Sequence, residues 1–268
     1  MSEQAGGAHA VASARVLAAF NRRDVRRFRD VFLASLRASG NHQKVVAVGY
    51  GLRSSEVRML SRLPNVRIID RPHNGQMPPV RRLRDFGDVV EELPKQTPVA
   101  YWDAADVVFQ GRLDPLWELT QSHPSQLLAV REPLGYPHNP AVHAWCTSIS
   151  NAAKRREAFD LVFPSPFLNS GFGSGTAATM LRYFRTADRI RNSSDVMGTT
   201  DWGDQLAMNL YCHREADRWK EVSATWNFCV LDRLHVRVAR DGTILCDSQT
   251  PICVHGNGQS LPQLAIRP

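Results

Sequence analysis

Short apolar runs alternate with amphipathic stretches along the first half of the chain. The run at 15–20, R-V-L-A-A-F, and the β-branched runs at 44–48 and 66–69 are typical of buried strands. The segment between the first two runs predicts a helix capped by Asp24 and ended by Gly40. Its apolar positions fall on one helical face: Val25, Phe28, Val31, Phe32 and Leu36.

Further helices and strands are expected at similarly short intervals. A short helix is expected at 54–63 and a longer one from Pro79, and another helix starts at Asp114. A short strand is expected at 127–130, whereas 71–79, with three prolines and an Asn-Gly pair, predicts a loop able to move over a site. This alternation predicts an α/β fold whose mostly parallel sheet is covered by helices on both faces.

The alternation ends after Arg131. Prolines at 133, 137, 140, 164 and 166 predict irregular chain there, which is typical of a region built around a sheet to hold a second ligand. No internal repeat or linker is visible, so we expect one domain over 14–262. Residues 1–13, rich in alanine, glycine and serine, are expected to be disordered.

The most informative stretch is 99–109, V-A-Y-W-D-A-A-D-V-V-F. It predicts a buried strand that ends in two carboxylates, Asp103 and Asp106, with small residues between them. The carboxyl ends of strands in open α/β sheets are where such sheets bind ligands. Paired carboxylates there need a counter-charge, either basic side chains or a hard divalent cation. The alternative is a turn whose aspartates cap the next segment.

Three later stretches carry further candidate chemistry. Residues 167–175, F-L-N-S-G-F-G-S-G, allow close backbone approach and precede a helix expected near Thr176, although a plain strand-to-helix turn is the alternative. Residues 199–209, T-T-D-W-G-D-Q-L-A-M-N, predict a helix with a polar start, which is either a site or a satisfied cap. Residues 252–258, I-C-V-H-G-N-G, predict a strand ending in a histidine, which is more often structural than functional.

Composition limits the class of protein. The chain has 268 residues, 43% of them apolar, which is enough for a sizeable core. It carries 33 basic and 26 acidic residues, and nearly all the basic ones are arginines. The surplus favours an anionic partner. Without a long basic tract, a phosphorylated small molecule fits better than nucleic acid, because the arginine fork matches phosphate.

Nothing in the sequence indicates a membrane span or a secretory leader. The apolar runs are far shorter than a span, and the first residues lack a basic and then apolar layout. Five cysteines form no C-x-x-C pair, which fits reduced, packed thiols. We therefore expect a cytoplasmic protein.

The order of these motifs resembles the GT-A fold glycosyltransferases. It comprises a first strand ending in an aromatic residue, then Asp-x-x-Asp, Asn-Ser-Gly, Asp-Gln-x-x-x-Asn and a late His-Gly-x-Gly. The sequence is most similar to the glycogenin-like family and to the glycosyltransferase domains of collagen lysyl hydroxylases. The resemblance spans roughly residues 15 to 258 and implies a nucleotide-binding half, 14–130, and an acceptor-side half, 131–262.

The resemblance also implies roles for individual residues. Asp103, Asp106 and His255 would hold Mn²⁺, or Mg²⁺, against a nucleotide diphosphate, and carboxylates with an imidazole suit these ions. The residues implied to catalyse transfer are Asp204, Gln205 and Asp201. Those implied to contact the donor are Phe20, Asn21, Arg82, Trp102, Ala104, Asn169, Gly256 and Gly258.

The implied activity is transfer of a sugar from a nucleotide diphosphate sugar, expected to be a UDP-sugar, to a small-molecule or glycan acceptor with retention. One departure is the absence of a Lys-Pro-Trp after His-Gly-Asn-Gly, so an arginine would replace that lysine at the diphosphate. A nucleotidyltransferase is an alternative, but it would carry a glycine-rich, lysine-containing loop where this chain reads N-R-R-D-V. A catalytically silent sugar- or nucleic-acid-binding protein is the other alternative.

Overall fold

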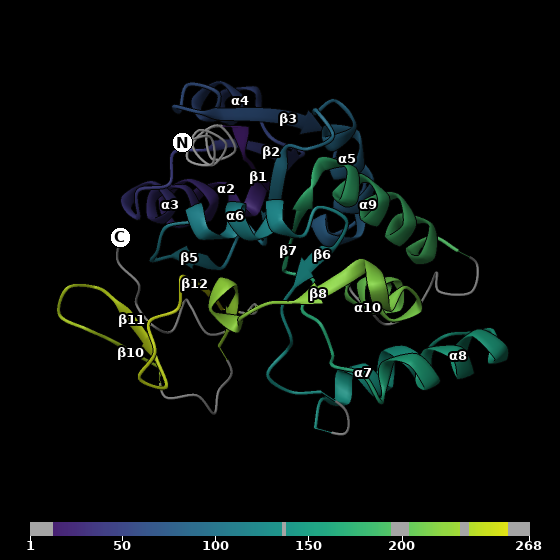
Figure 1. Cartoon of the computed structure of the whole chain (residues 1–268). Coiled ribbons are helices and arrows are strands. Elements are labelled where there is room, and N and C mark those ends of the chain that lie inside the picture. Colours follow the sequence, from purple (N-terminus) through teal and green to yellow (C-terminus); the bar gives the residue numbers. More distant parts are fainter. Residues whose placement is uncertain (1–12, 136–137, 194–203, 231–235, 257–268) are drawn as a thin grey trace, which may run out of the picture.

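A seven-stranded sheet forms the centre of the protein (Figure 1), with the order β3-β2-β1-β4-β7-β6-β8. The computed structural model describes residues 13–135, 138–193, 204–230 and 236–256. The neighbours β1, β2, β3 and β4 run parallel, whereas β7 runs antiparallel to β4 and β6. The expected mostly parallel sheet is therefore confirmed, with β7 as the exception. The strands are β1 (Arg15–Asn21), β2 (Lys44–Tyr50), β3 (Val66–Arg71), β4 (Pro98–Trp102), β6 (Leu127–Ala129), β7 (Phe172–Thr176) and β8 (Trp219–Glu221).

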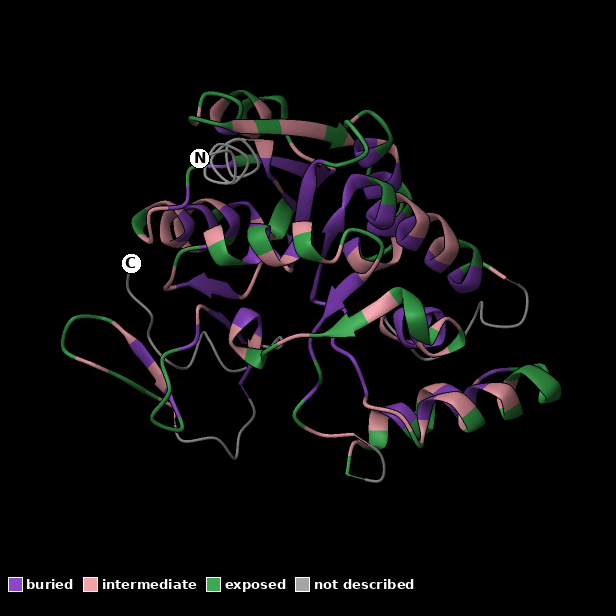
Figure 2. Cartoon of the chain, viewed as in Figure 1, coloured by how far each residue is buried: buried purple, intermediate pink, exposed green. Residues whose placement is uncertain are grey.

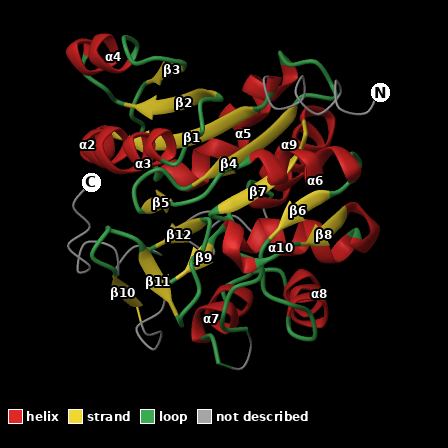
Figure 3. Ribbon diagram, turned by 60° about the vertical axis from the view of Figure 1, so that its left-hand side comes forward, coloured by secondary structure: helices red, strands yellow, loops and turns green. Residues whose placement is uncertain are grey.

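Helices cover both faces of this sheet, as Figure 3 shows. Because side chains alternate along a strand, Val99 and Tyr101 of β4 enter one core, and Ala100 and Trp102 enter the other. Both cores are buried, and the exposed residues of the helices lie on the surface of the molecule (Figure 2). The main helices are α3 (Ala34–Ala38), α4 (Ser54–Leu60), α5 (Pro78–Glu91), α6 (Asp114–Ser122), α9 (Ala177–Arg191) and α10 (Gln205–Arg214).

The helical segment after β1 differs from the expected single helix. It passes through a 3-10 turn η1 (Arg22–Asp24), α2 (Val25–Arg27) and a π-helical segment η2 (Phe28–Leu33) before α3. The prediction that Asp24 caps it is wrong, because Asp24 makes no capping hydrogen bond. Asn21 caps η1 instead, by accepting from the backbone N–H of Arg23 at 2.8 Å. Gly40, at φ +78°, ends the segment as predicted.

A second, three-stranded sheet has the order β5-β12-β9. The run at 99–109 is divided between the two sheets, because β4 ends at Trp102 and the chain continues as β5 (Val107–Phe109). The strand β5 is antiparallel to β12 (Cys253–His255), which is parallel to β9 (Phe228–Cys229). The aspartate pair therefore lies where the chain crosses from one sheet to the other.

The prediction of irregular chain after Arg131 is partly wrong. Two helices lie there, α7 (Pro140–Thr147) and α8 (Ala152–Val162). Pro140 occupies the first position of α7, where a missing N–H costs nothing, and Pro164 follows α8. These prolines mark helix ends and not irregular chain. The second half of the glycine-rich run forms β7, which leads directly into α9, so the helix expected near Thr176 is confirmed.

The remaining elements are short. They are the hairpin of β10 (Val236–Val238) and β11 (Ile244–Cys246), and the 3-10 turns η3 (Ala216–Arg218) and η4 (Ala224–Trp226). Within the described residues, no helix combines the length and apolar character that crossing a bilayer requires.

Candidate active site

A cavity of about 410 Å³ opens at the carboxyl ends of β1 and β4. Strand order reverses between these neighbours, since β2 and β3 follow β1 on one side and β4 lies on the other. Open α/β sheets bind ligands at such a reversal. The lining residues are Ala19, Phe20, Asn21, Asp24, Met77, Pro78, Pro79, Arg82, Asp103, Ala104, Ala105, Asp106, Trp145, Ser170, Asp204, Gln205 and His255.

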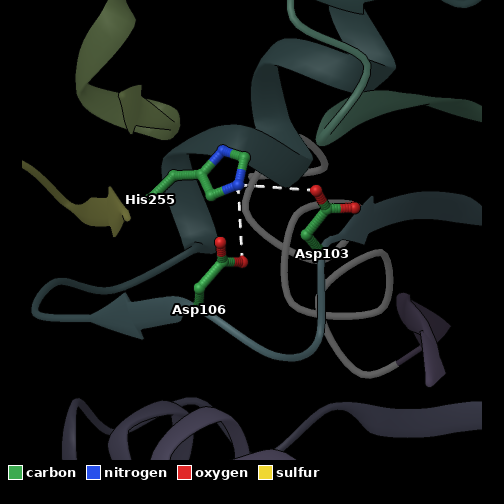
Figure 4. A group of neighbouring side chains, drawn as sticks. All are labelled: Asp103, Asp106 and His255. Atoms are coloured by element: carbon green, nitrogen blue, oxygen red, sulfur yellow. Dashed lines mark ion pairs between the residues drawn. The ribbon is translucent and has the colours of Figure 1, made fainter. Parts of the chain in front are cut away.

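Three side chains in the cavity wall form a candidate metal site (Figure 4). His255 Nε2 lies 3.4 Å from Asp103 Oδ2 and 3.5 Å from Asp106 Oδ1, and the three candidate ligand atoms lie within 4.8 Å of one another. Neighbouring ligands of an octahedral ion, each about 2.1 Å from it, would be about 3 Å apart. Small side-chain adjustments would therefore give ligand geometry for a divalent ion.

The electrostatics of this cluster are those of opposite charges held together. Burial alone raises the pKa of Asp103, but the Arg82 guanidinium and His255 outweigh it and hold that pKa well below its usual range. Burial alone lowers the pKa of His255, but Asp106 and Asp103 raise it well above the ordinary value. Without a cation, the imidazolium thus supplies part of the positive charge that the two carboxylates require.

The donor set fits Mn²⁺ or Mg²⁺ better than a closed zinc site. It consists of two carboxylates and one imidazole facing an open cavity, without a thiolate. Cys229 Sγ lies 3.7 Å from the other ring nitrogen of His255, and burial raises the pKa of this thiol to about 11. Cys229 is therefore a neutral neighbour of the histidine and not a metal ligand.

Arg82 connects the candidate metal site to the start of α10. Its guanidinium donates to Asp204 Oδ2 at 2.7 Å and Asp204 Oδ1 at 2.9 Å, to the backbone oxygen of Ser170 at 2.7 Å, and also to Asp103. Arg82 is 3% exposed and Asp204 is 1% exposed. The Arg82 guanidinium, which is expected to contact a diphosphate, thus holds the carboxylates of Asp103 and Asp204 in place. Contact between Arg82 and a donor stays a prediction.

Glu132 is a buried site residue that the sequence analysis did not identify. Its Oε1 accepts from Gln205 Nε2 at 2.8 Å and from Asn169 Nδ2 at 2.7 Å, and the residue is 6% exposed. Asn227 Nδ2 in turn donates to Asn169 Oδ1 at 2.9 Å and lies 3.3 Å from His255 Nδ1. A continuous chain of polar side chains therefore joins the catalytic candidate Gln205 to the metal candidate His255. An acidic residue two positions after the strand at 127–130 was the available signal.

Gly171 shows why the Asn-Ser-Gly motif needs its glycine. A Cβ there would lie 2.5 Å from His255 Cε1, 2.7 Å from Asn169 Oδ1 and 3.0 Å from Asp103 Oδ2. Its carbonyl also accepts from the backbone N–H of Asp103 at 3.0 Å. The close backbone approach expected of this segment occurs beside the metal candidates.

Most of the predicted site residues meet in the cavity. Those that line it are Phe20, Asn21, Arg82, Asp103, Ala104, Asp106, Asp204, Gln205 and His255. Trp102 does not line it, because its ring packs in the core against Phe109 and Phe172 and donates to the backbone oxygen of Trp226 at 3.0 Å. Asn169 and Gly256 are buried and do not line it, and Asp201 and Gly258 fall outside the described residues.

Comparisons with known proteins place this fold. Searches with the sequence found no matching family model and no matching curated protein. The structure matches the galactosyltransferase LgtC, solved in complex with donor and acceptor sugar analogues, with a TM-score of 0.59 at 17% identity over 92% of this chain and 88% of LgtC. It matches the apo form of the bifunctional glycosyltransferase WbbM with a TM-score of 0.59 at 14% identity, over 94% of this chain and 47% of WbbM.

A third match is the apo form of mouse xyloside xylosyltransferase 1, with a TM-score of 0.57 at 14% identity over 92% of this chain and 98% of that one. Structural matches at such low sequence identity show the fold alone. The chain therefore has the GT-A fold of glycosyltransferases, as its sequence motifs implied. The finer resemblance to the glycogenin-like family stays a prediction.

Proposed function

We propose that this chain is a metal-dependent glycosyltransferase that moves a sugar from a nucleotide diphosphate sugar, a UDP-sugar in the first instance, to an acceptor with retention. One observation carries the proposal: Asp103, Asp106 and His255 share a cavity with Asp204 and Gln205 at the reversal point of a GT-A sheet. LgtC, which has this fold, was solved with donor and acceptor sugar analogues.

The donor would lie with its nucleotide against the end of β1 and its diphosphate at the acidic cluster. Phe20 and Asn21 line the cavity at the end of β1 and would contact the base and ribose. A divalent cation held by Asp103, Asp106 and His255 would neutralise the phosphate oxygens and stabilise the departing diphosphate. The small side chain of Ala104 in the cavity wall leaves room for the donor.

The contacts of Asp204 favour retention. An inverting reaction needs a carboxylate base within hydrogen-bond reach of the acceptor hydroxyl. Both oxygens of Asp204 accept from Arg82, and Glu132 accepts from Gln205 and Asn169. These two described carboxylates beside Gln205 are therefore occupied and poorly placed to remove a proton. Asp204 would orient sugar hydroxyls.

Gln205 is the candidate for the group beneath the reacting carbon. Its amide is held by Glu132, and it lines the cavity beside Asp204. A carbonyl oxygen in this position would stabilise the positive charge that develops on the sugar during transfer. A second LgtC structure is of an active-site mutant in which a glutamine is replaced by glutamate, which supports the choice of Gln205.

A panel of nucleotide sugars incubated with Mn²⁺ tests the proposal. We expect release of the nucleoside diphosphate from at least one donor, slowly to water and faster to a suitable acceptor. Release of pyrophosphate from a sugar phosphate and a nucleoside triphosphate would favour the nucleotidyltransferase instead. Proton NMR of the first product tests retention: an α-linked donor should give an α-linked product, whereas a β-linked product would move the base role to Asp201 or Asp204.

A further inference from the structure

The region between Arg131 and Pro166 reaches the cavity through one side chain. Among the described residues of this region, Trp145 of α7 is the one that lines the cavity wall. The helix α7 packs against α10, whose first turn carries Gln205 (Figure 3). Trp145 therefore shares the cavity with Asp204 and Gln205 and lies on a helix that packs against the one that carries Gln205.

The local structure fixes the position of this indole. Asn139 caps α7 by accepting from the backbone N–H of Ala141 at 3.1 Å, and Val142 and Cys146 anchor its buried face. The indole ring packs against Phe167 with ring centroids 5.9 Å apart and an interplanar angle of 39°. The Trp145 side chain is thus supported from behind while it remains part of the cavity wall.

The groups around Trp145 combine an aromatic surface with polar side chains. Asp204, Gln205 and Ser170 line the same cavity and offer hydrogen-bond donors and acceptors. Within the described residues, the Trp145 indole N–H has no hydrogen-bond partner, so it is available to a ligand. A pyranose has a matching surface, because its C–H face packs on an aromatic ring and its hydroxyls form a polar rim. A purely apolar acceptor would leave the polar groups unpaired.

We propose that Trp145 is the stacking platform for the acceptor and that the acceptor is a pyranoside. This inference rests on the proposed function, since it assigns the substrate that receives the sugar. Trp145 determines which acceptor binds, and it leaves donor binding to the end of β1 and the acidic cluster.

Two substitutions test the platform, with a matched control. Trp145→Phe keeps an aromatic ring, and Trp145→Leu keeps only an apolar side chain. Trp219 provides the control, because it is also half-buried against the same core and does not line the cavity. Thermal unfolding should show that the Trp145 and Trp219 variants remain folded to similar extents.

The kinetic readout separates acceptor binding from donor binding. With methyl pyranosides as acceptors, Trp145→Leu should raise the acceptor KM about tenfold, since the contact between the aromatic ring and the sugar face is lost. Trp145→Phe should raise it less. Nucleoside diphosphate affinity and donor hydrolysis in water should stay at wild-type levels in both variants. Equal losses in donor hydrolysis, or an unchanged acceptor KM in Trp145→Leu, would overturn the inference.

A binding measurement keeps this inference distinct from the proposed activity. Methyl pyranosides should change the tryptophan fluorescence of the wild type and of Trp219→Leu but not that of Trp145→Leu. Donor turnover with peptide or alkyl alcohol acceptors and none with pyranosides would overturn the pyranoside assignment and leave the glycosyltransferase proposal standing. Fluorescence changes at Trp145 in a chain that consumes no nucleotide sugar would support the platform and refute the transferase.

Discussion

Arg82 and Asp204 stand 122 residues apart in the chain and meet in a buried bidentate ion pair. The pair ties α5 to the start of α10 beneath the cavity. Its charges are removed from water, so the protein depends on both partners being present, because a single buried charge without its partner is far more costly than an exposed one.

Arg82→Leu should lower the free energy of unfolding by about 3–5 kcal/mol, since it leaves Asp204 buried without a counter-charge. The double variant Arg82→Leu/Asp204→Leu should lose less than the sum of the two single losses, because neither member of this buried pair is then left without the other. Urea unfolding of the four proteins measures this. Arg84→Leu, on the exposed side of the same helix, is the control. Additive losses would show that the two residues do not stabilise each other.

Asp106→Asn should weaken nucleoside diphosphate binding in the presence of Mn²⁺ by at least about tenfold, because an amide is a weaker ligand than a carboxylate. A chelator should produce the same loss in the wild type and no further loss in the variant. Asp217→Asn, an exposed aspartate, should bind as the wild type does. Calorimetric titration gives the affinities. Wild-type affinity that persists in excess chelator would refute the metal site.

Mn²⁺ affinity should rise with pH above about 6.5. Without a cation, Asp106 and Asp103 outweigh the lowering effect of burial and hold the pKa of His255 well above 6.5, so the metal must displace a proton from Nε2. The same raised pKa stabilises the metal-free protein below pH 6.5, and this stabilisation is lost as the pH rises through the folded-state pKa. Calorimetry in buffers of different ionisation enthalpy should detect the released proton. His42→Gln should retain this release, and a His255→Gln variant that still releases it would contradict the assignment.

Glu132→Leu should lower both stability and turnover, because it leaves the buried amide of Asn169 and that of Gln205 without their shared acceptor. The expected loss in the free energy of unfolding is about 2–4 kcal/mol. Glu132→Gln keeps an oxygen at the same position and should recover most of both quantities. Denaturant unfolding and steady-state turnover test this, with Glu118→Leu on the exposed face of α6 as the control. Equal damage in the Gln and Leu variants would show that the carboxylate charge matters, and not the hydrogen bonds.

The fold class could be predicted from the sequence because it depends on local patterns, whereas the complete set of metal candidates was implied by the resemblance to GT-A glycosyltransferases. The apolar run that begins at Val99 indicates a strand, and Asp103 and Asp106 follow the end of that strand at Trp102. The apolar residues before His255 likewise indicate a strand. Contacts between residues far apart in the chain could not be predicted from local patterns. Nothing in the segment around Arg82 indicates that its fork binds Asp204.

The prediction of irregular chain after Arg131 fails for a physical reason, which is that proline has different effects at the end and in the middle of an element. Pro140 and Pro164 suggest irregular chain, but they flank helices. The glycine-rich run at 167–175 does allow the close backbone approach that was expected of it, since a Cβ on Gly173 of β7 would lie 2.7 Å from the Tyr101 ring. Glu132 and Trp145 were missed because only the folded chain brings Glu132 beside Gln205 and Trp145 into the cavity wall.

The crossing of the chain between the two sheets also bears on how the molecule folds. Asp103 and Asp106 leave the central sheet early in the chain, whereas His255 arrives on β12, near the end of the described residues. The cluster therefore joins residues far apart in the chain, and it is complete only where β12 is paired with β5. A bound cation would hold β12 to the segment that carries Asp103 and Asp106. Amide hydrogens of β12 should therefore exchange with solvent more slowly when the cation is bound.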